Sequence, residues 1–130
     1  ISGYISGGKL NFIGGGQSVN VDHSNYSSSI GGFDNDVFSG SFSVIGGGRQ
    51  NLISGVVGES IADNIAIAGG QQNKVLAAPY GFIGGGRNNL ISGSLGIYSA
   101  ILAGAENEIK QSQYAVILDR EIKSQIQTLL

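Results

Sequence analysis

The sequence predicts an all-β fold, a parallel β-roll with two short strands per coil and repeats of about 16 residues. Three observations support this prediction. A glycine-rich motif recurs along the chain, apolar β-branched residues flank each glycine run, and asparagine returns at a fixed place in the motif. Helical repeats are excluded, because each glycine inside a helix costs roughly 1 kcal/mol.

Composition limits the class of protein. The chain has 130 residues, of which 23 are glycine, 41% are hydrophobic and 12% are charged, with a net charge of −2. Disordered chains combine low hydrophobicity with high net charge, so we expect one folded domain. The absence of cysteine excludes disulfides and thiol chemistry. Scattered basic residues predict no nucleic-acid partner, and the lack of a long apolar run predicts no membrane insertion. The glycine runs lack the Lys-Ser/Thr and the following helix of a phosphate loop, and we expect no cofactor.

The repeat unit is Ile-Gly-Gly-Gly-x-x-Asn-x-Ile-x-Gly, clearest at 45–55 and 83–93. Successive anchor positions, 17, 15, 22, 16, 18 and 16 residues apart, are Ile13, Ile30, Ile45, Ile67, Ile83, Ile101 and Ile117. Either Ile5 or Ile13 anchors the first full coil. The opening Ile1-Ser2-Gly3 matches Ile53-Ser54-Gly55, so we expect the chain to begin in mid-repeat as a piece of a longer protein.

Each coil is expected to contain two strands and two turns. The first strand reads x-x-Ile-Gly, a turn Gly-x-x-Asn of constant length follows, and the second strand reads Asn-x-Ile-x-Gly before a turn of variable length. The asparagines before the second strand are Asn35, Asn51, Asn73, Asn89 and Asn107. Stacked side-chain amides can form a hydrogen-bonded ladder. Val19 stands at this place in the first clear coil. Asn20 beside it has two interpretations, as a substitute for the missing ladder asparagine or as a residue outside the ladder.

The first strand is apolar on both faces. The outward positions before the anchors are Phe12, Ser29, Val44, Ala66, Phe82, Ala100 and Val116, and three places before the anchors stand Phe42, Tyr80, Tyr98 and Tyr114. The second strand instead presents Asn20, Asp36, Lys74 and Glu108 beside Leu52 and Leu90. Strands that are apolar on both faces are normally buried on both. We therefore expect the first face to meet a partner and the second to meet water.

The last residues change period. From Asp119, a plausible helix N-cap, glycine disappears, and Ile122, Ile126 and Leu129 follow the spacing of a coiled-coil seam. We predict a β-roll domain over 1–118 and the start of a trimeric coiled coil over 119–130. The double-faced strands and the seam together favour a homotrimer, intertwined or side by side, although the seam alone also allows a dimer.

Tandem Gly-Gly-x-x-Asn-x-Ile coils feeding a coiled coil resemble the glycine-rich β-solenoid segments of phage and viral tail fibres, and the heads of trimeric autotransporter adhesins. The resemblance covers roughly 13–118. It implies a homotrimer on a virion surface, or at an extracellular cell surface, that attaches to a host glycan or protein. The IGGG core replaces the Ala-Ile-Gly style of the adhesin heads and no neck motif is present, which favours a viral fibre.

Two classes of function follow from these patterns. The leading hypothesis is a structural or adhesive fibre segment that is not an enzyme. The alternatives are a polysaccharide-degrading fibre domain, which needs two nearby carboxylates, and the head of a bacterial adhesin. The close acidic pairs in the sequence are Asp34 with Asp36 and Glu106 with Glu108. We interpret His23 and the segment 34–36 as turn residues rather than as a metal site.

Candidate receptor contacts lie in turns. Arg49 and Arg87 occupy equivalent turn positions at one edge, where they are solvated, pair with acids of a neighbouring chain or contact an anionic glycan. The long coil predicts a protrusion over 56–63, and a smaller one falls at 94–97. Glu59, Ser60 and Asp63 are the candidates for a receptor-binding rim, with packing over the trimer seam as the alternative.

Overall fold

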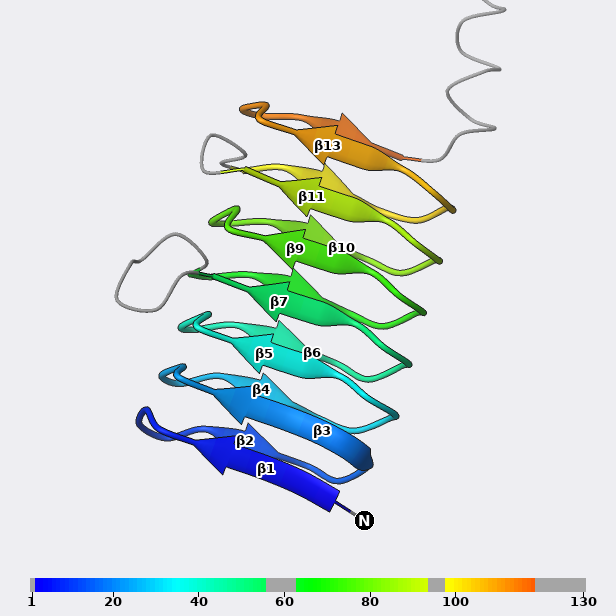
Figure 1. Cartoon of the computed structure of the whole chain (residues 1–130). Coiled ribbons are helices and arrows are strands. Elements are labelled where there is room, and N and C mark those ends of the chain that lie inside the picture. Colours follow the sequence, from blue (N-terminus) through cyan, green and yellow to red (C-terminus); the bar gives the residue numbers. More distant parts are fainter. Residues whose placement is uncertain (1, 56–62, 94–97, 119–130) are drawn as a thin grey trace, which may run out of the picture.

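The computed structural model describes residues 2–55, 63–93 and 98–118. Over these residues the chain is all-β, and short parallel strands stack into a ladder of coils (Figure 1). The described part contains no helix of the length and apolarity needed to cross a bilayer. The predicted coiled coil at 119–130 lies outside the described residues, as do 94–97 and most of the predicted protrusion.

The strands form two sheets of seven, one from the odd-numbered and one from the even-numbered strands. The odd-numbered strands are β1 Ser2–Ser6, β3 Gln17–Asp22, β5 Asp36–Phe38, β7 Leu52–Ser54, β9 Lys74–Leu76, β11 Leu90–Ser92 and β13 Glu108–Lys110. The even-numbered strands are β2 Phe12–Ile13, β4 Ser28–Ser29, β6 Val44–Ile45, β8 Ala66–Ile67, β10 Phe82–Ile83, β12 Ala100–Ile101 and β14 Val116–Ile117. The prediction of a parallel solenoid with two strands per coil is confirmed.

The coils wind with a left hand. In Figure 1 the odd-numbered strands lie in front and run from right to left, whereas the even-numbered strands lie behind and run back. The chain climbs from the N-terminus at the bottom, and this combination of rotation and rise is left-handed. Isolated parallel bridges at the right-hand turns, such as Arg49 with Gln71, extend the ladder between the sheets.

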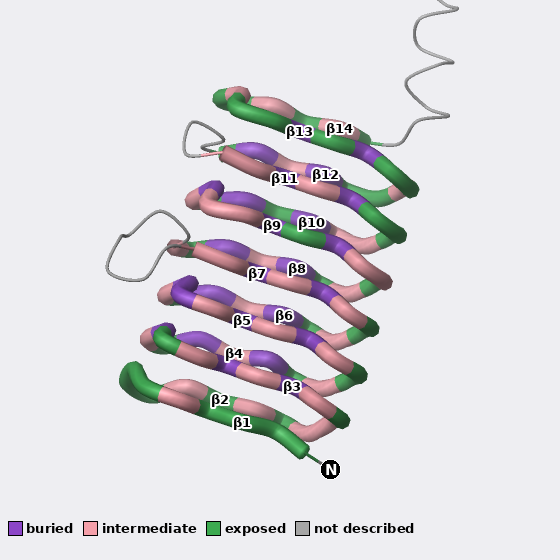
Figure 2. The backbone as a smooth tube through the Cα atoms, viewed as in Figure 1, coloured by how far each residue is buried: buried purple, intermediate pink, exposed green. Residues whose placement is uncertain are grey.

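The core is a double column of β-branched residues between the sheets. Ile45, Ile67, Ile83 and Ile101 of the even strands are fully buried, as is the facing column of Val37, Ile53, Val75 and Ile91 from the odd strands. In Figure 2 buried stretches of the tube recur on both sheets from coil to coil. Side chains alternate across a strand, so neighbouring residues point outward. Each strand after β3 therefore buries at most one large side chain, whereas β3 buries both Val19 and Val21. Each coil depends on its neighbours for the rest of its core.

The second coil corrects one predicted anchor. In β4 the inward residue is Ser29, which is fully buried, whereas Ile30 is 52% exposed. The predicted anchor at Ile30 and the predicted outward position of Ser29 are therefore wrong by one residue. The fixed spacing carries the signal for this register, because Asn35 follows Ser29 by six residues, as Asn51 follows Ile45. This register was hard to recognise in the sequence, because a serine stands where most other coils have isoleucine.

The first coil also differs from the simplest prediction. Ile5 of β1 pairs with Val21 of β3 and so belongs to the inward column of the odd strands, whereas Ile13 is the first residue of the even-strand column. Both residues thus serve the first coil in different sheets. The residues that align with Ile53-Ser54-Gly55 are Ile5, Ser6 and Gly7 rather than 1–3.

The turns from even to odd strands, at 14–19, 30–35, 46–51, 68–73, 84–89 and 102–107, form the asparagine edge. Its predicted ladder is confirmed, and all five asparagines are buried. The Asn73 backbone N–H donates to Asn51 Oδ1 at 3.0 Å, and Nδ2 donates to the carbonyls of Gly69 and Gly86, each at 3.0 Å. Asn89 continues the ladder onto Asn73 Oδ1.

Val19 interrupts this ladder at its first position. The side chain of Val19 is fully buried, and Asn20 points outward, where its Nδ2 donates to Asp36 Oδ1 at 2.7 Å. Asn20 therefore does not substitute for the missing asparagine.

The turns from odd to even strands form the variable edge, which includes 7–11, 23–27, 39–43 and 77–81. A shorter polar ladder begins here, where Asn11 Oδ1 accepts the Ser27 N–H, Ser27 Oγ accepts the Ser43 N–H, and Ser43 Oγ accepts the Ile65 N–H. Gly55 and Gly93, which precede the two insertions in the sequence, lie at this edge.

Candidate functional site

The outer face of the even-strand sheet, called the even face below, carries no charged residue among the described strands. Its first outward column is Phe12, Ser28, Val44, Ala66, Phe82, Ala100 and Val116, and its second is Gly14, Ile30, Gly46, Ala68, Gly84, Leu102 and Leu118. Phe12 and Val116 are 58% and 60% exposed. An apolar surface of this length is unusual for a soluble monomer.

The two columns of the even face complement each other in size. Phe12 stands beside Gly14, and Phe82 stands beside Gly84, whereas the smaller Ala100 stands beside Leu102. A methyl group placed on Gly84 would lie 3.4 Å from Cε1 of Phe82, so the ring covers the glycine. Large and small residues thus stand side by side in several coils, whereas Ala66 with Ala68 combines two small residues and Val116 with Leu118 combines two large ones.

An aromatic ladder runs along the variable edge beside the even face. Tyr26 stacks on Phe42 with ring centroids 5.0 Å apart, Tyr80 stacks on Tyr98 at 4.8 Å, and Tyr98 stacks on Tyr114 at 5.6 Å. All five have positive φ, so they belong to the turn before each even strand rather than to the strand itself. Tyr26 joins this column only in the corrected register, and the sequence analysis missed it for that reason.

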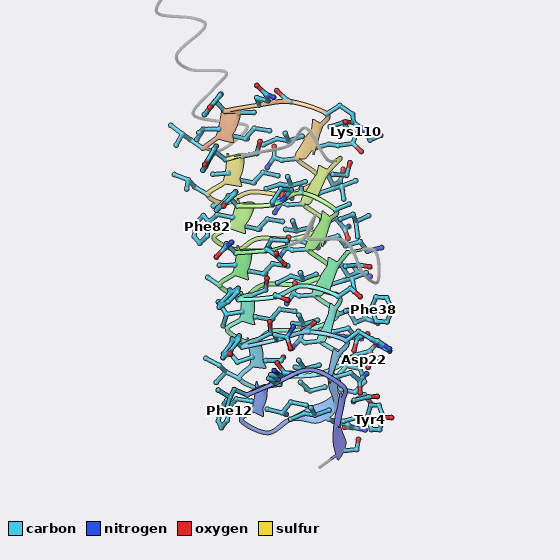
Figure 3. All side chains as sticks on the ribbon, turned by 90° about the vertical axis from the view of Figure 1, so that its left-hand side faces the viewer. Tyr4, Phe12, Asp22, Phe38, Phe82 and Lys110 are labelled. Carbon is cyan, nitrogen blue, oxygen red and sulfur yellow. The ribbon has the colours of Figure 1, made fainter. Side chains whose placement is uncertain are left out.

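The outer face of the odd-strand sheet, called the odd face below, is polar. Its outward columns are Tyr4, Asn20, Asp36, Leu52, Lys74, Leu90 and Glu108, and Ser6, Asp22, Phe38, Ser54, Leu76, Ser92 and Lys110. Lys110 Nζ lies 2.8 Å from Glu108 Oε1. Figure 3 places Phe12 and Phe82 on one side of the solenoid and Tyr4, Asp22, Phe38 and Lys110 on the other. The predicted contrast between an apolar and a polar face is confirmed.

A groove of about 420 Å³ crosses the odd face over β1, β3, β5 and β7. Its outward lining residues are Tyr4, Asn20, Asp22, Asp36, Phe38, Leu52 and Ser54, and the inward-pointing Val37 forms part of its floor. The groove lies between two outward columns, so strand backbone separates its walls. It combines two aromatic rings with two carboxylates and contains no lysine or arginine in its lining.

The carboxylates of this groove have unlike partners. Burial raises the pKa of Asp36 above its ordinary value, the hydrogen bond from Asn20 opposes that effect, and the nearby charge of Asp34 adds to the increase. Asp22 Oδ1 is buried and lies 2.8 Å from His23 Nδ1, a distance typical of an ion pair but without hydrogen-bond geometry. The groove therefore presents an excess of acceptors.

Asp22 and Asp36 were not predicted to lie near each other. They stand 14 residues apart, which is one coil less two residues, and therefore occupy adjacent strands and different outward columns. The pairs chosen from the sequence divide differently, because Asp34 and Glu106 lie at turn positions with positive φ, whereas Asp36 and Glu108 point outward from strands. The repeat length was the signal in the sequence from which the proximity of Asp22 and Asp36 could have been predicted.

The predicted receptor contacts lie at both edges. Arg49 and Arg87 are exposed in one column of the asparagine edge, as predicted, and the Arg49 guanidinium lies 5.7 Å from the ring centroid of Phe33. Asp63 Oδ1 accepts the Ser41 N–H at 3.1 Å, a contact that joins successive coils. Glu59 and Ser60 lie outside the described residues, and their receptor role stays a prediction.

The described residues contain no group of three or more side chains that could hold a metal ion. His23 takes the turn position predicted for it, with φ of 49°. No family model matches the sequence, and no curated protein is significantly similar to it.

Proposed function

We propose that this chain is a structural segment of a homotrimeric fibre on a virion or cell surface, which supports attachment to a host. The observation that carries the proposal is the even face. It carries no charged residue among the described strands, and Phe12, Ile30 and Leu118 are among its exposed side chains. Burying such a face against copies of itself would recover roughly 25 cal/mol for each Å² of apolar surface.

The strand pairing favours protomers that stand side by side. Each described strand pairs with the neighbouring coil of its own chain, so both sheets are continuous without strands from a partner. An intertwined roll would instead place strands of different chains next to each other. The number three rests on the resemblance to fibre and adhesin segments and on the heptad spacing at 119–130.

The proposal is tested by mass measurement in solution at micromolar concentration. The expected mass is three times the 13.3 kDa of the chain. Phe82→Asp places a charge at the centre of the even face and should shift the population to monomer, because an unpaired charge at an apolar interface is costly. Lys74→Asp, on the odd face, is the matched control and should remain trimeric.

A circular dichroism melt of each variant would verify that the fold is retained. Phe82 is 37% exposed and points away from the core, so the folded monomer tolerates the charge. A monomeric wild-type protein, or equal effects of the two substitutions on mass, would contradict the proposed role of the even face.

A further inference from the structure

The groove on the odd face lies opposite the surface assigned to assembly and has no role in it. Tyr4 projects from β1 with 60% of its surface exposed, and Phe38 lies half-buried on β5 in the other outward column. Two strand spacings separate their strands, about 10 Å along the axis. Rings at this separation border a shallow trough rather than a deep hole.

The polar groups of the groove select ligands that donate hydrogen bonds. Ionised Asp22 and Asp36 can only accept, and the amide nitrogen of Asn20 already donates to Asp36, which leaves its oxygen free to accept. The lining contains no lysine or arginine, but the imidazole of His23 lies 2.8 Å from Asp22 Oδ1 and can offset the charge of that carboxylate. The excess of negative charge therefore lies mainly at Asp36. A cationic ligand with several donors is favoured, and an acidic one is repelled.

From these contacts we propose that the groove binds an ammonium-bearing saccharide, that is, a glucosamine-type oligosaccharide. Its sugar rings would lie against Tyr4 and Phe38, and its ammonium and hydroxyl groups would donate to Asp22, Asp36 and Asn20. Aromatic rings attract cations and offer flat apolar surface, while a few convergent polar groups determine orientation. The inference deepens the proposed function, on which it rests, by naming a ligand class and a site for attachment.

A lysine side chain is the competing cationic ligand. It is narrow and flexible, and it fills a deep pocket better than a trough spanning four strands. The length of the groove and the two aromatic rings along it therefore favour a chain of sugar rings.

The test is calorimetric titration of the full chain with a chitosan tetramer at about pH 6, where the amino groups carry protons. Binding should weaken at least about tenfold in Asp22→Asn/Asp36→Asn, which preserves side-chain shape while removing charge. Tyr4→Ala should also weaken it. Glu108→Gln, in the same outward column but outside the groove, is the matched control and should bind like the wild type.

Two further ligands distinguish the sources of binding. The fully N-acetylated tetramer should bind at least about tenfold more weakly than the chitosan tetramer, because it lacks the ammonium groups. A lysine tetrapeptide that matches the affinity of the chitosan tetramer, or tetramer binding unchanged in the double variant, would overturn the inference.

The same titration with Phe82→Asp separates this inference from the proposed assembly. A monomeric variant that binds the tetramer supports the groove whatever the fate of the trimer. A wild-type trimer that does not bind the tetramer would overturn the groove and leave the assembly intact.

Discussion

The asparagine edge and the variable edge solve the same problem, reversing the chain between stacked strands, by different means. At the asparagine edge every turn has the same length, and buried amides connect one coil to the next. At the variable edge the backbone still forms bonds between coils, such as Ala77 N–H to the Ser54 carbonyl at 2.8 Å, but turn length differs from coil to coil. The asparagine edge therefore sets the register of the coils, and the variable edge accommodates insertions.

The longest coil illustrates this division. Ile45 and Ile67 are 22 residues apart in the sequence, yet they pair directly in adjacent strands. The backbone N–H of Asn73 still donates to Asn51 Oδ1 in the preceding coil. The additional residues of this coil fall in the sequence between Gly55 and Asp63, which lie at the variable edge. An insertion at the variable edge therefore leaves the core columns in register.

Insertion of a Gly-Ser pair should affect stability very differently at the two edges. Placed between Gly70 and Gln71, it should lower the free energy of unfolding by more than about 3 kcal/mol, because it displaces the Gln71 and Gln72 backbone bonds and the Asn73 amide. Placed after Ala77, the same pair should cost less than about 1 kcal/mol, since loop closure depends weakly on length. Urea unfolding measures both, and similar losses would refute the division between the edges.

Adjacent glycines at 69 and 70 provide a finer test within one turn. A Cβ on Gly70, where φ is +93°, would meet the Gly86 carbonyl oxygen of the next coil, whereas a Cβ on Gly69 would meet nothing within 4 Å. Gly70→Ala should therefore cost about 3 kcal/mol through strain and separation of the coils. Gly69→Ala should change stability by less than about 0.5 kcal/mol. Thermal melts of the two variants are the measurement, and equal melting temperatures would contradict the close stacking.

Polar side chains at the two edges should differ in their contribution to stability. Asn73→Ala leaves the Asn89 N–H and the Gly69 and Gly86 carbonyls without their amide partner, so we expect a loss of about 2 to 3 kcal/mol. Ser99→Ala at the variable edge removes one hydrogen bond, from Ser99 Oγ to the Ser112 carbonyl, at a cost of about 1 kcal/mol. Chemical denaturation of both variants checks the order, which an equal or reversed result would disprove.

The pattern of residues predicted most of the fold because the solenoid is built from local repeats. Isoleucine and valine in alternating positions and asparagine at a fixed place identified both sheets and the ladder. The errors occurred where one residue type departs from its column. Ser29 lies inward with its Oγ buried and without a hydrogen-bond partner, and hydrophobicity alone favoured the exposed Ile30 as the anchor.

The candidate groove was harder to predict, because its residues come from four coils. Tyr4 and Leu52 are 48 residues apart in the chain and share one outward column only after the coils stack. Asn20, Asp36 and Leu52 were predicted to point outward, but they were not combined with Asp22 or Phe38. The two aromatic residues of the groove, Tyr4 and Phe38, do not belong to the repeating motif.

The pattern of residues is sufficient to predict stacked two-strand coils, because glycine, asparagine and β-branched residues restrict each short segment to a turn or a strand. It also predicts which sheet is apolar outside, since alternation assigns every second residue to the surface. The register of each coil, the left-handed winding and the meeting of distant residues in the groove emerge only when the coils stack. These depend on contacts between coils, and the backbone bonds and buried amides that set them become visible only once the coils are stacked.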